Sequence, residues 1–331
     1  MTKRPKGLPA WTAPVLESVR PVVEAARHVA IDPGAIDSVA RWMAYEDFDV
    51  PLGGPQFDVG LVGVDLIDWT LVNDALNFAF TDFETGRRFD ATWRGATWAD
   101  SDAMHACFAR ALAAGVPVLD GAWMAGVDRA ALNRIFDGTI EMPMLGRRVE
   151  ILNEIGATLV ERYDGKFHRF VAACAPAMYA DGDGLLERLV SEFPRFDDVS
   201  DYHGRTIRFY KLAQLGLWGL HRTGLVPLDD IGAMTAFADY IVPLALRVMG
   251  ILEYAPELAS AIDSRTLIPR DSDEEIEIRA ATVWATADLT EAVNARRPAD
   301  MQLVIPQIDY RLWNSYHATF APHHLTETIM Y

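Results

Sequence analysis

The sequence is poor in cysteine and in positive charge, and both deficits narrow what the chain can be. It holds two cysteines, Cys107 and Cys174, in 331 residues. Two are too few for a disulfide framework, and neither has a cysteine or histidine nearby at metal-ligand spacing. The 30 basic residues are outnumbered by 47 acidic ones, which gives a net charge of −17. Because this charge repels phosphate chains, we expect no stable complex with nucleic acid.

Long apolar runs are missing as well. The longest run, residues 240–252, contains Pro243 and Arg247 and is too short to span a bilayer. The basic first residues are followed by Gly7 and Pro9 instead of an apolar segment, so no secretion signal is evident. We therefore expect a cytoplasmic protein without a membrane partner, a metal ion or a cofactor.

What the chain has in abundance is apolar sequence at helical spacing. Hydrophobic residues make up 50% of it, which is enough for a buried core. We predict a mainly α fold with at most a small β-hairpin, over residues 85–97. Residues 1–10 are expected to form a disordered tail, and residues 11–331 a single globular unit or two helical subdomains with the site between them. The predicted helices cover residues 15–29, 34–45, 102–114, 121–136, 145–163, 166–179, 184–193 and 205–220.

The segment 209–254 is the predicted chemical centre, because it holds Lys211 and Asp239 in apolar company. Pro243 fits a helix only in its first turn, which predicts a helix that starts near Tyr240 and carries Leu244, Val248, Ile251 and Leu252. Asp239 would then lie at the N-terminal end, where unpaired N–H groups and the helix dipole favour an ionised carboxylate. Such a group suits charge stabilisation or base catalysis. The alternative is a helix cap without a chemical role.

Lys211 lies on the preceding predicted helix, on one stripe with Ile207, Gln214 and Trp218. It either works beside Asp239 or extends past the core to solvent.

A second candidate lies between Asp68 and Phe83, where Asn77 and Asp82 stand among the aromatic residues Phe78 and Phe80. Aromatic faces stack on a flat heterocycle, while an amide and a carboxylate bond its edges. The alternative is the buried end of a helix with a capping aspartate.

Four blocks of the sequence, in this order and spacing, resemble the queuosine salvage protein family. They read FYKLAQLGLWGL, FADYIVPLALRVMGILEY, EIEIRAATVW and IDYRLWN, and the similarity runs from about residue 22 to residue 331. The family comprises N-glycosylases/hydrolases that act on queuosine 5'-monophosphate. The resemblance implies a small-molecule substrate, queuine as product, no cofactor, and a helical architecture like that of helix-hairpin-helix DNA glycosylases.

The resemblance also implies roles for the two central residues. Asp239 would stabilise an oxocarbenium-like transition state, attack C1' directly or activate a water molecule. Lys211 would keep Asp239 ionised, bind the 5'-phosphate or protonate the leaving base.

The remaining candidates follow from the chemistry of such a substrate. The flat base calls for an aromatic surface, its edges and ammonium group call for polar and acidic partners, and the phosphate calls for donors. The aromatic candidates are Phe78, Phe80, Tyr240 and Trp313. The edge and ammonium partners are Asn77, Asp82, Glu277 and Asp309. The phosphate candidates are Lys211, Arg279, His323 and Tyr331. For Glu277 and Arg279 the alternative is a solvated ion pair on the helix that begins after Ser272.

The sequence leaves two other functions open. The first is a glycosylase that acts on bases in DNA or RNA, although the scattered arginines and lysines form no basic stripe. The second is a non-catalytic helical binding protein.

Overall fold

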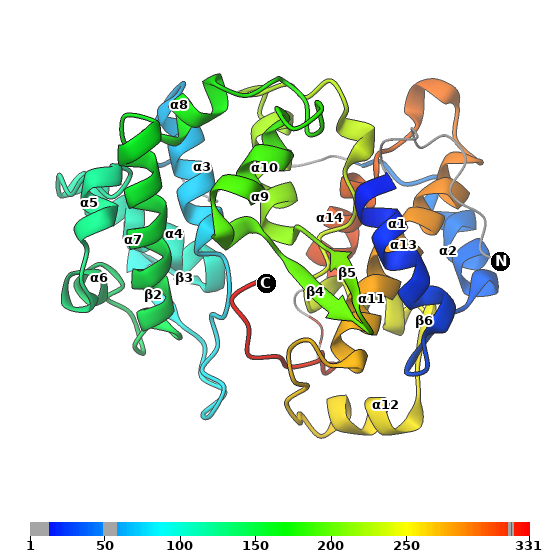
Figure 1. Cartoon of the computed structure of the whole chain (residues 1–331). Helices are drawn as coiled ribbons and strands as arrows, with labels where there is room; N and C mark the ends of the chain where they lie inside the picture. The colour runs from blue at the N-terminus through cyan, green and yellow to red at the C-terminus, as the bar shows by residue number, and fades with distance from the viewer. Residues whose placement is uncertain (1–12, 49–57, 317–318, 320) are drawn as a thin grey trace. The chain divides into compact units, whose positions relative to one another are not determined.

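The computed structural model describes residues 13–48, 58–316, 319 and 321–331, so the predicted tail at residues 1–10 lies outside the described residues. The chain separates into two compact units. Unit 1 comprises residues 1–51, 198–214 and 230–327, and unit 2 comprises residues 52–197, 215–229 and 328–331. The elements are mainly helices, as predicted (Figure 1). In the described ranges, no helix has the length and apolarity that a membrane span needs.

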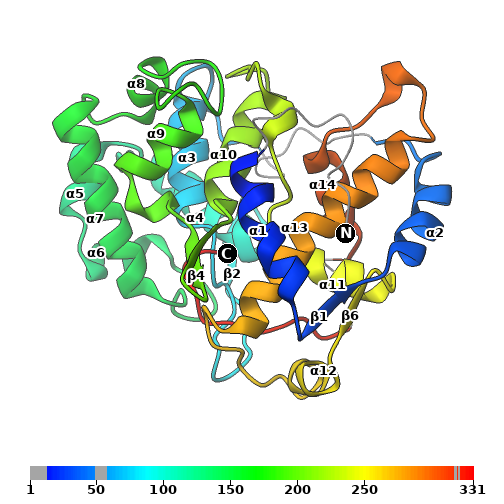
Figure 2. The same cartoon turned by 45° about the vertical axis from the view of Figure 1, so that its right-hand side comes forward.

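Unit 1 is organised around α13 (Asp273–Asn294), which packs against α1 (Ala13–Ala25) and α2 (Pro33–Met43), as Figure 2 shows for α1. Its first turn is capped by Ser272, whose hydroxyl accepts the Glu275 N–H at 3.3 Å. The other elements of unit 1 are β1 (Val29–Ile31), β4 (Val199–Tyr202), β5 (Arg205–Arg208), the first turn of α10 (Lys211–Arg222), the 3-10 turns η3 (Ile231–Ala233) and η4 (Ala299–Met301), α11 (Ile241–Val248), β6 (Leu252–Tyr254), α12 (Pro256–Asp263) and α14 (Ile305–Tyr316).

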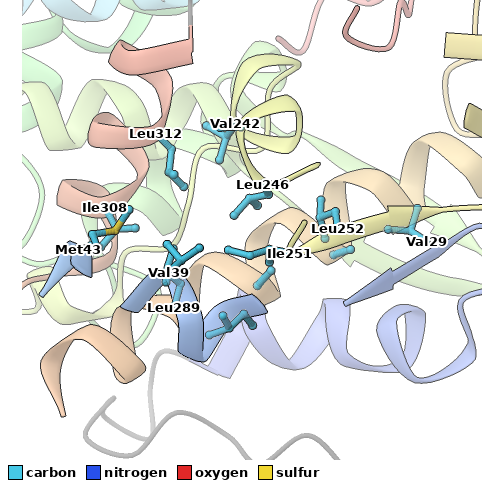
Figure 3. Close-up of a cluster of buried hydrophobic side chains, with 14 of the residues drawn as sticks. Val29, Val39, Met43, Val242, Leu246, Ile251, Leu252, Leu289, Ile308 and Leu312 are labelled. Carbon is cyan, nitrogen blue, oxygen red and sulfur yellow. The ribbon is translucent and has the colours of Figure 1, made fainter. Parts of the chain in front are cut away.

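The core of unit 1 joins the helices that carry the predicted site. Val242 and Leu246 of α11 and Ile308 and Leu312 of α14 are buried in one hydrophobic cluster with residues of α2 and α13 (Figure 3). Apolar burial of this kind stabilises by about 25 cal/mol per Å². It therefore holds α11 and α14 in place. These helices position Asp239, which precedes α11, and Asp309, which lies within α14.

The described residues of unit 2 form helices and one β-hairpin. Its elements are α3 (Asp65–Ala75), β2 (Asp90–Trp93), β3 (Ala96–Ala99), α4 (Asp100–Ala113), α5 (Gly121–Gly126), α6 (Arg129–Ile135), α7 (Leu145–Arg162), α8 (Phe167–Ala172), α9 (Leu185–Glu192), the 3-10 turn η2 (Pro194–Phe196) and the rest of α10. Helices α5 and α7 lie side by side (Figure 1). Gly156 permits this approach, because a Cβ atom there would lie 2.3 Å from the Ala125 nitrogen.

The prediction of at most one β-hairpin is wrong, because the described residues form three two-stranded antiparallel sheets: β1 with β6, β2 with β3, and β4 with β5. The hairpin predicted over residues 85–97 pairs residues 90–99. The segment 199–208, part of which was predicted as helix, forms the β4–β5 hairpin. His203 and Gly204 make its turn with φ of 53° and 80°, a backbone that ends any helix. Helix α10 therefore starts at Lys211 instead of residue 205.

The prediction of a helix after Asp239 is confirmed at its start and wrong at its end. Helix α11 begins at Ile241 with Pro243 in the first turn, but it ends at Val248. Gly250 follows with φ of 73°, a left-handed conformation that stops the helix. Ile251 and Leu252 consequently lie beyond α11, with Leu252 in β6.

Candidate active site

Asp239 caps helix α11. Its Oδ1 accepts the N–H groups of Ile241 at 2.8 Å and Val242 at 2.9 Å, and the residue is 6% exposed. These donors and the positive end of the helix dipole stabilise a negative charge on the carboxylate. Because the donors sit on a helix packed into the core, they also fix the direction of the carboxylate.

The backbone that leads to Asp239 is held by side chains from three helices. Gln214 of α10 accepts the Thr235 N–H at 2.8 Å. Asp309 of α14 accepts the Phe237 N–H at 2.8 Å, and Arg279 of α13 donates to the Ala238 carbonyl at 3.2 Å. Residues 235–239 are therefore positioned by tertiary hydrogen bonds, not by regular secondary structure.

Lys211 is the first residue of α10 and is 6% exposed, so it does not extend freely into solvent. Its N–H donates to Asp198 Oδ2 at 3.1 Å. Burial raises the pKa of the Asp309 carboxyl, and the charge of Lys211 acts on that group in the opposite direction with smaller effect. The structure thus brings Lys211 and Asp309, two of the predicted site residues, into one electrostatic neighbourhood.

Asp309 is a buried carboxyl with a strongly displaced pKa. It is 3% exposed, and burial raises its pKa well above the ordinary value, with the negative Asp239 as a second cause. The Phe237 N–H and the Lys211 charge act in the opposite direction but with smaller effect. Burial and the negative charge of Asp239 therefore favour the protonated form of Asp309, beside a second carboxylate.

Glu277 is buried, which rules out the alternative of a solvated pair. One of its oxygens accepts three backbone N–H groups, those of Arg27 at 2.9 Å, His28 at 2.6 Å and Val29 at 3.2 Å. The other accepts the Tyr202 hydroxyl at 3.1 Å. These contacts tie β1 and β4 to α13. A contact between Glu277 and substrate stays a prediction.

Arg279 is 1% exposed, and its guanidinium contacts other side chains of the protein. Asp198 binds it through two hydrogen bonds of 3.0 and 2.6 Å, and the Phe209 ring lies 3.9 Å from its guanidinium carbon. Its predicted role in phosphate binding likewise stays a prediction.

Tyr240, the residue that follows Asp239, contacts a histidine from the C-terminal segment. The Tyr240 and His323 rings have centroids 4.6 Å apart, at an angle of 34°. His324 is 2% exposed, and burial, with the nearby His323 and Arg279 charges as smaller causes, lowers its pKa to about 3. Trp313 packs partly against the core of unit 1. The structure thus pairs two of the predicted residues, Tyr240 and His323.

The second predicted group belongs to unit 2. Asn77 is half-buried, whereas Phe78 and Phe80 are 1% and 6% exposed. Two buried arginines lie against the Phe78 ring, with guanidinium carbons 4.0 Å (Arg148) and 4.9 Å (Arg195) from its centroid. Both guanidinium groups thus make cation–π contacts with Phe78, in which the positive charge is attracted to the electron-rich face of the ring.

Arg148 also holds the backbone of this stretch. It donates to the carbonyls of Leu76, Phe78 and Ala79, and Ala79 has φ of 44°, a left-handed conformation. Burial, and less so the charge of Arg195, lowers the pKa of Arg148 to about 9.

Asp82 and Tyr331 complete the predicted set, and both belong to unit 2. Asp82 caps a turn, accepting the Thr85 N–H at 2.7 Å and the Thr85 hydroxyl at 2.5 Å. The hydroxyl is the main reason that the pKa of this carboxylate is lowered. Tyr331 is 5% exposed.

The sequence reasoning missed Asp198 and Arg148, which contact the backbone of predicted site residues. Asp198 lies within the segment RFDDVSDYHG, residues 195–204. This segment shows no helical or strand periodicity that would single out one of its aspartates. Arg148 follows Arg147 at the start of α7, and nothing in the sequence tells which of the two is buried. In the part of the chain that the structure describes, no three His, Cys, Asp or Glu side chains converge as metal ligands.

Comparison with known proteins agrees with the resemblance of the four blocks. A family model described as queuosine salvage protein matches residues 62–331. A Sphaerobacter thermophilus protein named queuosine 5'-phosphate N-glycosylase/hydrolase is 37% identical over 324 residues, which cover 96% of this chain and 97% of that protein.

Eukaryotic proteins of the same name are similar over most of their length. The Bos taurus protein is 28% identical, over 90% of this chain and 91% of its own length. The Schizosaccharomyces pombe protein is 29% identical, over 86% of each chain. Because a family model covers most of the sequence and one relative exceeds 30% identity over nearly all of it, the chain belongs to the queuosine salvage protein family.

Proposed function

We propose that this protein is a hydrolase that cleaves the N-glycosidic bond of queuosine 5'-monophosphate and releases queuine for reuse in tRNA modification. The observation that carries the proposal is the placement of Asp239. It is a buried carboxylate held by the first turn of α11, near a second carboxyl whose pKa is raised by burial, and it directly precedes Tyr240 in the chain. The similarity to enzymes of that name over nearly the whole chain supports the choice of substrate.

In this proposal Asp239 stabilises the positive charge that develops on the ribose during cleavage. Breaking the bond between base and ribose builds positive charge on the sugar, and a fixed anion beside the ring stabilises that charge. The two N–H donors of α11 keep the carboxylate oriented before the substrate arrives, so no reorganisation is needed during the reaction. Direct attack at C1' and activation of water use the same placement.

Asp309 takes a role that suits a neutral acid. A protonated carboxyl donates a hydrogen bond and carries no charge to pair with an ammonium group. We therefore assign it to an acceptor on the substrate, at the edge of the base or on the ribose, instead of to the ammonium of queuine. A proton on Asp309 also limits the repulsion between two carboxylates in one site.

Lys211 supplies the positive charge of the same neighbourhood. Its position at the start of α10 is fixed by the bond from its N–H to Asp198. We propose that it holds the negative charge of Asp239 in place and contacts the phosphate or the leaving base. The contacts proposed for Asn77, Phe78, Phe80, Asp82, Tyr240, Trp313, Glu277, Arg279, His323 and Tyr331 remain predictions.

The proposal also includes the architecture and the setting. We propose an architecture like that of helix-hairpin-helix glycosylases, supported by the chain order of α9, the β4–β5 hairpin, α10 and an aspartate before α11. A fold does not fix a function, so this likeness adds no argument for the substrate. The net charge of −17 suits a mononucleotide better than intact tRNA, and we propose a cytoplasmic enzyme without a stable nucleic-acid partner.

A turnover assay tests the proposed reaction. Purified protein is incubated with queuosine 5'-monophosphate, and free queuine is followed by mass spectrometry, with guanosine 5'-monophosphate as the control nucleotide. We expect queuine from the first and no guanine from the second. Release from queuosine-containing RNA or DNA alone would instead support a polymer glycosylase, and binding without release would support a non-catalytic protein.

A further inference from the structure

We infer that the buried ion pair between Asp198 and Arg279 is a positioning device that sets the backbone of both Lys211 and Asp239. The inference rests on the proposed function, because it assigns the pair to the same site. Neither residue of the pair needs to touch the substrate for this role.

The pair itself is rigid and dry. Asp198 Oδ1 lies 3.0 Å from Arg279 Nη1, and Oδ2 lies 2.6 Å from Nη2, with the two side chains 2% and 1% exposed. Two parallel hydrogen bonds between a planar guanidinium and a carboxylate fix both groups in direction as well as distance. The Phe209 ring, 3.9 Å from the guanidinium carbon, restricts it further.

On one side the pair reaches Lys211. Asp198 Oδ2 accepts the Lys211 N–H at 3.1 Å, and the Asp198 carbonyl accepts the Phe209 N–H at 3.0 Å and the Tyr210 N–H at 3.2 Å. Tyr210 has φ of 51°, a left-handed conformation that a tyrosine rarely adopts unless surrounding contacts enforce it. Asp198 supplies those contacts. It holds the strained residue immediately before Lys211 and caps the first turn of α10 from another part of the chain.

On the other side the pair reaches Asp239. Arg279 Nε donates to the Ala238 carbonyl at 3.2 Å. This carbonyl belongs to the peptide that joins Ala238 to Asp239, so its orientation sets the start of the Asp239 backbone. The same segment lies outside regular structure and depends on such tethers. One guanidinium thus connects the carboxylate that fixes Lys211 to the peptide that fixes Asp239.

A partly buried pair in unit 2 shows that an arginine bound to a carboxylate does not by itself produce this arrangement. Arg188 binds Glu192 at 2.8 Å, and its other donors reach the Tyr163 hydroxyl and the Ala173 carbonyl. None of these partners is a predicted site residue. Because a buried pair is often replaceable by apolar residues without loss of stability, stability alone does not explain Asp198 and Arg279. The pair contacts the backbone at Lys211 and Asp239, the two proposed catalytic residues, and these contacts explain it better. A displacement of a catalytic group by about 1 Å can lower a rate about 100-fold.

The decisive variant removes both charges of the pair, while Glu275, whose Oε1 lies 3.8 Å from Arg279 Nε, keeps the hydrogen bond from the Asp271 N–H. Asp198→Leu combined with Arg279→Met replaces both charges by apolar groups of similar size, and we expect a folded protein with unchanged far-UV circular dichroism. We expect kcat for queuosine 5'-monophosphate to fall at least about 10-fold, while KM changes less than about 3-fold. Arg279→Lys is the conservative partner. Its single ammonium group cannot match both carboxylate oxygens and the Ala238 carbonyl, so kcat should fall in the same way.

Glu192→Gln is the matched control, because it breaks the ion pair of unit 2. It should lower the unfolding temperature and leave kcat at the wild-type value. Wild-type kcat in the folded double variant, or an equal loss of kcat in Glu192→Gln, would overturn the inference. If the double variant does not fold, the kcat of Arg279→Lys decides the question: a loss supports the inference and a wild-type value overturns it. A wild-type protein that releases no queuine would contradict the proposed function instead, so the two failures are distinguishable.

Discussion

Asp239 stands before the first turn of α11, whereas Asp309 lies within α14, and the two carboxyl groups meet different surroundings. Asp239 accepts two N–H groups at the positive end of a helix. Asp309 accepts one N–H, from Phe237, and faces the charge of Asp239 from a fully buried position. The first arrangement favours a negative charge, and the second raises the pKa and favours a proton.

The comparison teaches that residue type alone does not decide which charge state the surroundings of a carboxyl group favour. We propose that two N–H donors hold Asp239 as an anion, whereas burial and the neighbouring charge favour a proton on Asp309. Pairs of titratable groups whose surroundings push their pKa values apart are the usual sign of divided acid and base roles. Substitutions at the two aspartates test this division, starting with the largest expected effect.

Replacing Asp239 by Asn removes the anion while preserving shape. We expect kcat to fall by about 1,000-fold, with binding of queuosine 5'-monophosphate retained, because only the charge that acts in the transition state is lost. Turnover is measured by queuine release and binding by calorimetry. Asp229→Asn, at an exposed aspartate ten residues earlier, serves as the control and should match wild type. Equal activity of the two variants would reduce Asp239 to a helix cap.

Replacing Asp309 tests the neutral acid. An Asn at this position still accepts the Phe237 N–H and still offers a donor, whereas an Ala does neither. We expect Asp309→Asn to lower kcat/KM by about 10-fold or less and Asp309→Ala by about 100-fold. The measurement is a kinetic comparison of the two variants. If Asn is as damaging as Ala, Asp309 works as an anion and the division is wrong.

The pH dependence of stability should change in opposite directions for Asp309 and His324. Between pH 3.8 and its raised pKa, Asp309 keeps a proton only in the folded state, so this residue makes stability fall by about 1.4 kcal/mol per pH unit as pH rises. His324 binds a proton only in the unfolded state between about pH 3 and 6.5, so it makes stability rise with pH over that range by a similar amount.

Variants isolate the two slopes. Relative to wild type, Asp309→Asn should gain stability as pH rises above 3.8, and His324→Gln should gain stability as pH falls below 6.5. Urea unfolding at several pH values gives both differences. A difference that does not vary with pH would show that the group has the same pKa in the folded and unfolded states.

The sequence was sufficient for the start of α11 because Pro243 permits only one place in a helix, and that local constraint placed Asp239 at the cap. It was not sufficient for Glu277, whose three N–H donors come from residues about 250 positions earlier. Nor could it give the start of α10, since His203 adopts a left-handed backbone that its residue type does not demand. The raised pKa of Asp309 depends first on burial and then on the charge of Asp239, and only the folded chain provides either.

Infrared spectroscopy of protein labelled with ¹³C at the aspartate carboxyls tests the division most directly. Spectra of wild type, Asp309→Asn and Asp239→Asn are recorded at pH 7 and subtracted. Asp288, whose pKa burial raises to about 7, contributes equally to all three and cancels. We predict that Asp309→Asn removes the band of a protonated carboxyl and that Asp239→Asn removes only a carboxylate band. Loss of a carboxylate band in Asp309→Asn would contradict the account.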